Sequence, residues 1–118
     1  MSALVAETLV FDAAEIADLA AAPAGDDLSA KLLWRSGPSA SGVMHARAGA
    51  ELGSHVHPDI AHHMWIMEGG CQVLGREVGP GGYVYVPAGN EHAIVVGPWG
   101  CTFFFVYAHE PTTPSTHP

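Results

Sequence analysis

The sequence predicts an all-β protein built as one sandwich or barrel, preceded by a short helix. Its 118 residues are enough for one hydrophobic core but not for two. Fourteen glycines and nine prolines separate many short runs of valine, isoleucine, tyrosine and phenylalanine, a pattern typical of short strands joined by tight turns. We find no internal repeat and no sign of a second domain.

The N-terminal part, residues 1–27, is expected to hold an extended apolar segment and a short helix. Asp12, followed three residues later by Glu15, has the spacing of a capping box. Ile16 and Leu19 would then lie on one side of a helix that ends near residues 22–23.

Residues 28–110 are expected to form the barrel, and residues 111–118, rich in proline and threonine, a disordered tail. Residues 25–29 and 36–42 are predicted to be loops, because small and turn-forming residues dominate them. Residues 69–70, both glycine, are predicted to turn the chain back into a hairpin. The predicted strands cover residues 31–35, 43–48, 62–68, 71–74, 83–86, 92–96 and 102–108.

Three histidines between Gly49 and Gly69 have a spacing that favours a metal site. His55 and His57 are two residues apart, so they point the same way from a strand. Pro58 ends that strand, and His62 then opens the apolar run HMWIM, which is predicted to be the next strand. If the two strands pair, three imidazoles converge on one point, as they do around a metal ion.

This stretch resembles the first motif of the cupin family. The family pattern is a glycine, five residues, His-x-His, a short spacer, an acidic ligand, six residues and a glycine. Here the matching residues are Gly49, His55, His57, His62 and Gly69, with His62 where the family usually has glutamate.

A later stretch resembles the second cupin motif, with Val96 where an asparagine is usual. Its matching residues are Gly81, Pro87, Gly89 and His92. The resemblance covers roughly residues 40–108 and implies a cupin-type double-stranded β-helix, that is, a jelly-roll barrel. It also implies one divalent transition metal per chain, held by His55, His57, His62 and His92.

The fourth ligand could be His62 or its neighbour, but not both, because adjacent strand residues face opposite sides. The family register puts His62 inward together with Met64 and Ile66. The other face, turned toward another sheet or a partner subunit, then carries His63, Trp65 and Met67. An alternative is that His62 forms a hydrogen bond beside the metal without binding it.

Two further points concern side chains near this site. His45 could line the cavity, but a histidine at this place more often lies on the surface or beside the ligands, and it is left out of the site. Phe103, Phe105 and Tyr107 alternate with Phe104 and Val106, and the sequence does not decide which set lines the pocket.

Charge and hydropathy exclude several classes of partner. The net charge is −8, and the only four Lys and Arg residues are dispersed along the chain, so nucleic acid and anionic membranes are unsuitable partners. No cationic signal-peptide start and no membrane-length apolar run are present. Two cysteines make no disulfide framework. We therefore expect a cytoplasmic protein.

A histidine in place of glutamate changes the chemistry that the site would support. Four neutral imidazoles leave the full charge of a divalent ion in place and put no carboxylate base among the ligands. Such a centre favours anionic chelating oxygens, such as those of enolates and catecholates. Ligand type suits Fe, Mn, Ni, Cu, Co or Zn.

The leading hypothesis is a metal-dependent enzyme acting on a small oxygenated compound, enolisable or aromatic, and we favour a dioxygenase or other oxidoreductase. The chain resembles, loosely, the cupin dioxygenases that split acetylacetone or hydroxyacetophenones. The alternatives are a non-redox isomerase, lyase or polyketide-type cyclase and a non-catalytic sensor. No catalytic residue is assigned beyond the metal centre. We expect a homodimer, because the apolar segment 4–10 and the outward face of the HMWIM strand would otherwise meet water.

Overall fold

The structure is a computed structural model that describes residues 7–52, 58–90 and 93–110. His55, His57 and His92 lie outside the described residues, as does the predicted tail, 111–118. Within the described part, the elements in chain order are α1 (Ala13–Asp18), β1 (Ala22–Gly25), β2 (Leu28–Ser36), β3 (Ser39–Ala46), β4 (Glu51–Leu52), β5 (Ile60–Val73), β6 (Arg76–Val78), β7 (Tyr83–Val86) and β8 (Ile94–His109).

The helix begins as the sequence predicts. The Asp12 side chain accepts a hydrogen bond from the Glu15 amide at 2.8 Å, and the Glu15 side chain accepts one from the Asp12 amide at 3.2 Å. The helix ends at Asp18, earlier than expected. Lys31 of β2 donates to the carbonyls of Ile16 and Ala17, which satisfies carbonyls at the end of the helix and ties it to the sheet.

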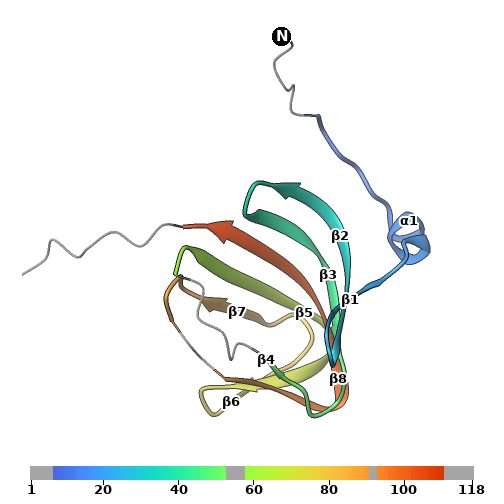
Figure 1. Cartoon of the computed structure of the whole chain (residues 1–118). Coiled ribbons are helices and arrows are strands. Elements are labelled where there is room, and N and C mark those ends of the chain that lie inside the picture. The colour runs from blue at the N-terminus through green and yellow to red at the C-terminus, as the bar shows by residue number, and fades with distance from the viewer. Residues whose placement is uncertain (1–6, 53–57, 91–92, 111–118) are drawn as a thin grey trace, which may run out of the picture.

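The strands form one antiparallel, strongly curved sheet (Figure 1). Its order is β1-β2-β3-β8-β5-β6, with β4 paired to β8 and β7 paired to β5. Together with the short helix, this confirms the predicted all-β jelly roll.

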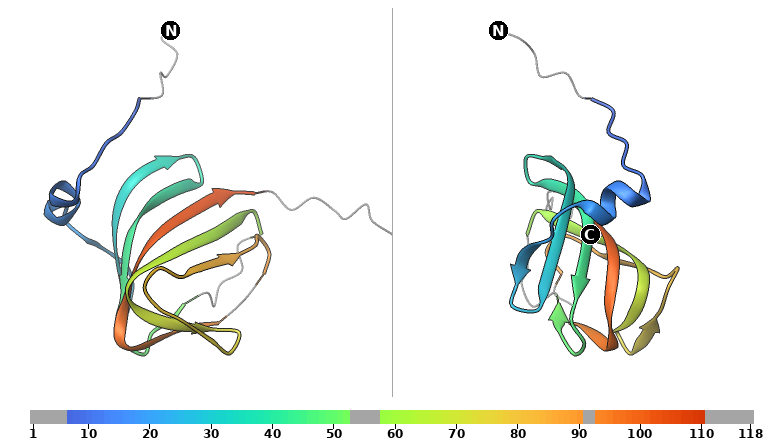
Figure 2. Two further views of the ribbon diagram at one scale, coloured as in Figure 1. Left: turned by 180° about the vertical axis from the view of Figure 1, so that it is seen from behind. Right: turned by 90° about the vertical axis from the view of Figure 1, so that its right-hand side faces the viewer.

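β5 and β8 hold the two sides of the barrel together. They have 14 and 16 residues and pair with each other along most of their length. Residues 60–69 of β5 pair with residues 101–109 of β8, and residues 71–73 with residues 94–96. Both strands therefore run along one side, bend, and continue on the other, as Figure 2 shows. The bend leaves β1, β2, β3 and β7 on one side and β4 and β6 on the other.

The hairpin expected at Gly69 and Gly70 is wrong, because β5 continues through both residues to Val73. The ladder with β8 shifts register between Gly69 and Cys71, so the glycines form an irregularity at the bend, not a turn. The chain turns at Leu74 and Gly75, where φ is 52° and 75°. Positive φ at both central residues is characteristic of the two-residue type I′ hairpin.

The loop predictions around β2 and β3 are also too long. Residues 28–29 belong to β2 and residues 39–42 to β3. Only Gly37 and Pro38 make the turn between the paired residues Ser36 and Ser39. The small residues beyond the turn serve packing, since a Cβ at Gly42 would come within 2.2 Å of the Lys31 carbonyl oxygen.

The core lies between the two sides of the barrel. Phe103 and Phe105 are each 3% exposed, and Phe104 and Val106 are only partly buried. The set that faces inward is therefore Phe103, Phe105 and Tyr107, a choice between two alternating sets that the sequence did not decide. The other buried hydrophobic side chains come from both sides: Ala40, Met44, Ala46, Ala50, Ala61, Met64, Ile66, Cys71, Val73, Val84, Val86, Ile94, Val96 and Cys101.

Candidate metal centre and its pocket

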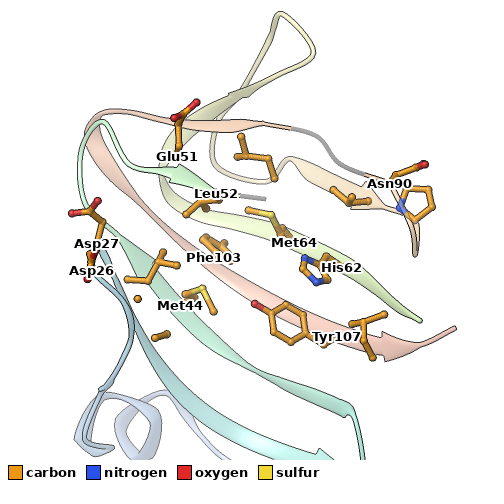
Figure 3. A pocket seen from close by; sticks show the side chains of 17 residues that line it. Asp26, Asp27, Met44, Glu51, Leu52, His62, Met64, Asn90, Phe103 and Tyr107 are labelled. Carbon is orange, nitrogen blue, oxygen red and sulfur yellow. The ribbon is translucent and has the colours of Figure 1, made fainter. Parts of the chain in front are cut away.

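A cavity of about 430 Å³ opens into the barrel between β3, β5 and β8 (Figure 3). Its middle is apolar, and its polar side chains gather toward the ends. The lining residues are Ala24, Gly25, Asp26, Asp27, Leu28, Met44, Glu51, Leu52, Ile60, His62, Met64, Val86, Pro87, Asn90, Ile94, Phe103 and Tyr107.

His62 lies on the inner face of β5, where it pairs in register with Val86 of β7 and Tyr107 of β8. The inward face of the strand is the expected one: Met64 is 4% exposed, and Trp65 is 42% exposed. The imidazole lies against the Tyr107 ring, with centroids 4.4 Å apart and planes 27° from parallel. One predicted ligand thus lines the cavity, and its role as a ligand remains a prediction.

Tyr107 stands next to His62 at the same end of the cavity (Figure 3). Its ring also contacts Phe105, with centroids 4.8 Å apart. Burial raises the pKa of the Tyr107 phenol, so the hydroxyl is protonated at neutral pH and can donate a hydrogen bond. Sequence reasoning named this residue only as a member of one of two alternating sets.

Three carboxylates lie at the side of the cavity away from His62, and sequence reasoning missed all of them. Asp26 and Asp27 are in the turn between β1 and β2, and Glu51 begins β4. None of the described lining residues is a lysine or arginine. An anionic group on a ligand would therefore meet repulsion at this side. The acidic composition of the chain is the only sequence signal that could have indicated these carboxylates.

The remaining predicted ligands, His55, His57 and His92, fall outside the described residues, although the residues beside them do not. Leu52, directly before residues 53–57, pairs with Ile94, which follows residues 91–92 after one position. Leu52, Ile94 and Asn90 all line the cavity with His62. Within the described part of the chain, no three possible ligand side chains come together.

The family described as the ChrR cupin-like domain matches residues 11–111. The chain belongs to this cupin family. No curated protein matches the sequence.

Several solved structures share this cupin fold. KdgF from Halomonas sp. superposes with a TM-score of 0.67 at 13% identity, covering 80% of this chain and 89% of that one. An acetylacetone dioxygenase from Acinetobacter johnsonii superposes with a TM-score of 0.66 at 18% identity, covering 91% of this chain and 77% of that one. A chain in the complex of Rhodobacter sphaeroides SigE with the anti-sigma ChrR superposes with a TM-score of 0.66 at 15% identity, covering 77% of this chain and 50% of that one. At these identities the likeness shows the fold alone.

The motif glycines of this cupin have the backbone conformation that explains them. Gly49, Gly69, Gly81 and Gly89 all have φ between 72° and 88°, a region that other residues rarely adopt. The departure at Val96 also has a physical reason. Its side chain is 2% exposed, so a polar amide there would be buried among apolar neighbours.

The face of β5 opposite the cavity carries a cluster of aromatic side chains. His63 Nδ1 lies 2.5 Å from the Tyr83 hydroxyl, and the Trp65 ring lies 4.9 Å from that of Tyr83.

His45, on β3, is exposed and hydrogen-bonded to Thr102 at 2.9 Å, as expected of a surface residue. No helix in the described ranges is long and apolar enough to cross a membrane.

Proposed function

We propose that this cupin is a metal-dependent enzyme acting on a small oxygenated compound, enolisable or aromatic, as a dioxygenase or related oxidoreductase. The observation that carries the proposal is the position of His62. Its imidazole lies at one end of a cavity whose walls are otherwise mostly apolar, and the residues beside both histidine motifs line the same cavity. Imidazole in a pocket with room for a ligand is the usual setting of a catalytic metal.

The donor set fits a transition metal. His55, His57, His62 and His92 would supply nitrogen ligands, which suit Fe, Mn, Ni, Cu, Co or Zn and do not suit Mg or Ca. When bound, such an ion supplies Lewis acidity and, if it is redox-active, the means to react with dioxygen. The packing of His62 against Tyr107 fixes the orientation of its ring, as ligand histidines require.

The size and lining of the cavity support the class of substrate. A volume of about 430 Å³ falls within the range of small-molecule sites. Met44, Met64 and Phe103 supply apolar contact surface, and no described cationic side chain lines the cavity to pair with a carboxylate or phosphate. Substrates that carry one or two oxygens on an apolar body therefore fit better than polyanionic ones.

The proposal is tested by elemental analysis of the purified protein and by oxygen uptake after reconstitution with each of the six metals. Acetylacetone is the first substrate to try, because a structural neighbour is an acetylacetone dioxygenase; 4-nitrocatechol represents aromatic substrates. We expect bound transition metal and substrate-dependent consumption of dioxygen. Substrate loss at the same rate without dioxygen would instead support the isomerase, lyase or cyclase alternative. Absence of any bound metal would contradict the proposal.

A second candidate is a non-catalytic sensor domain. The family match to the ChrR cupin-like domain and the neighbour in an anti-sigma complex favour it. Metal identity separates the two candidates: tightly held zinc without exchangeable water indicates a sensor or structural site. Iron or manganese with exchangeable water indicates an enzyme.

A further inference from the structure

We propose that Tyr107 positions the ligand of this pocket: its hydroxyl donates a hydrogen bond to a carbonyl, enolate or phenolate oxygen carried on an apolar body. The inference rests on the proposed function only in that a small oxygenated ligand occupies the cavity beside His62. It adds a residue that holds the ligand and is not one of the predicted metal ligands.

The Tyr107 ring is fixed in place. Phe105 packs against it at 4.8 Å and His62 at 4.4 Å. A side chain held by aromatic neighbours on a long central strand loses little further entropy when its hydroxyl engages a ligand. Its location is therefore suited to positioning.

The three tyrosines of the chain differ in their hydrogen bonding. On the outer face, the Tyr83 hydroxyl lies 2.5 Å from His63 Nδ1, and the Tyr85 hydroxyl donates to Glu110 at 2.7 Å. Among the described residues, no hydrogen bond reaches the Tyr107 hydroxyl, and the half-buried side chain lines the cavity. Because no buried side-chain oxygen in that part of the chain lacks a partner, this hydroxyl is open to the cavity. A phenol hydroxyl that faces the cavity and has no protein partner can donate to a molecule that binds there.

The Tyr107 hydroxyl and the apolar walls beside it select the chemistry of the ligand. A phenol with its proton is a donor toward carbonyl, enolate or phenolate oxygen. Beyond His62 and Tyr107, the cavity continues between Met44, Met64 and Phe103, which offer contact surface and no further strong donor. A ligand with an oxygen on an apolar body does both: the oxygen accepts a hydrogen bond from the hydroxyl, and the apolar body fills this space.

The test compares wild-type protein with Tyr107→Phe, using 4-nitrocatechol as the ligand. Tyr85→Phe is the matched control, because it removes a hydroxyl from the outer face and leaves the cavity unchanged. Absorbance titration gives the affinity, and a pH titration of the complex gives the pH at which bound 4-nitrocatechol ionises. Metal content and melting temperature are measured for all three proteins.

We expect Tyr107→Phe to weaken 4-nitrocatechol binding about 10-fold, the value of one hydrogen bond to a charged or partly charged oxygen. Ionisation of the bound catechol should move to higher pH, because its phenolate loses a donor. Tyr85→Phe should change neither. Nitrobenzene, which lacks the two hydroxyl groups of 4-nitrocatechol, should bind wild type and Tyr107→Phe equally.

Three results would overturn the proposal: unchanged affinity and ionisation in Tyr107→Phe, no binding of 4-nitrocatechol to wild type, or an equal loss for nitrobenzene. The last would show that the substitution disturbs packing. Failure of the proposed function is seen separately, as protein without bound metal. The titration still tests Tyr107 in that case, because this hydrogen bond needs no metal.

Discussion

His62 and His63 are neighbours on one strand, and the pleat of β5 gives them different surroundings. His62 lies inside against Tyr107, and His63 lies outside among Trp65, Tyr83 and Tyr85. A change of one position in the register would exchange every one of these contacts. The two residues therefore allow the inner face to be tested against the outer face with substitutions of the same kind.

Replacing His62 with glutamate should restore the ligand that the cupin motif usually has at this position. We expect His62→Glu to retain its metal, because carboxylate oxygen also binds transition metals. The added negative charge should weaken binding of anionic chelators such as 4-nitrocatechol. Metal analysis and absorbance titration measure the two effects. Loss of metal together with unchanged chelator affinity would contradict this role for the position.

Strand alternation showed that only one of His62 and His63 faces inward, and the register of the cupin motif chose His62. The spacing of Asp12 and Glu15 placed the capping box. The facing of Asp26, Asp27 and Glu51 could not be predicted, because loops and strand ends have no fixed period. Tyr107 could not be chosen over Phe104 for a related reason: both alternating sets on β8 are apolar enough to be inside.

At the scale of elements, the fold depends on the bend at which the paired strands β5 and β8 pass from one side of the barrel to the other. Gly69 has φ of 72°, and a Cβ there would lie 2.0 Å from the Gly100 carbonyl oxygen. The two strands can pair at the bend only because this position has no side chain. Sequence reasoning took Gly69 and Gly70 for a turn, since glycine pairs mark turns and bulges alike.

Gly69→Ala and Gly75→Ala separate backbone strain from this steric clash. Both positions have φ near 75°, and nothing lies within 4 Å of a Cβ built at Gly75. Gly75→Ala should lower the free energy of unfolding by roughly 1–2 kcal/mol. Gly69→Ala should cost that amount and a further ~1–3 kcal/mol for overpacking. Urea denaturation measures both, and equal midpoints would show that the bend tolerates a side chain.

At the scale of the whole molecule, the outer aromatic face is too apolar for a surface in water. We define this face as His63, Trp65, Tyr83, Tyr85 and Phe104, whose rings contact one another. Tyr83 is 47% exposed and Tyr85 41% exposed. Contiguous apolar patches of this kind mark interaction surfaces. The homodimer expected from the sequence remains a prediction, and this face is where we expect the second copy to bind.

Sedimentation tests the dimer. The wild-type protein should sediment at twice the 12.3 kDa chain mass at micromolar concentration. Trp65→Lys should sediment as the monomer, because a charge in the middle of the face is costly to bury. Trp99→Lys is the control: that side chain is 88% exposed, lies outside the face and should leave the dimer intact. A wild-type monomer would rule out the prediction.

The most direct test of a metal centre built on His62 is metal stoichiometry in wild type, His62→Ala and His63→Ala. We predict about one equivalent of transition metal in wild type and His63→Ala, and metal affinity about 10–100-fold weaker in His62→Ala, as expected when a group that holds a metal in place is removed. The opposite pattern, with metal lost from His63→Ala and kept in His62→Ala, would contradict the account.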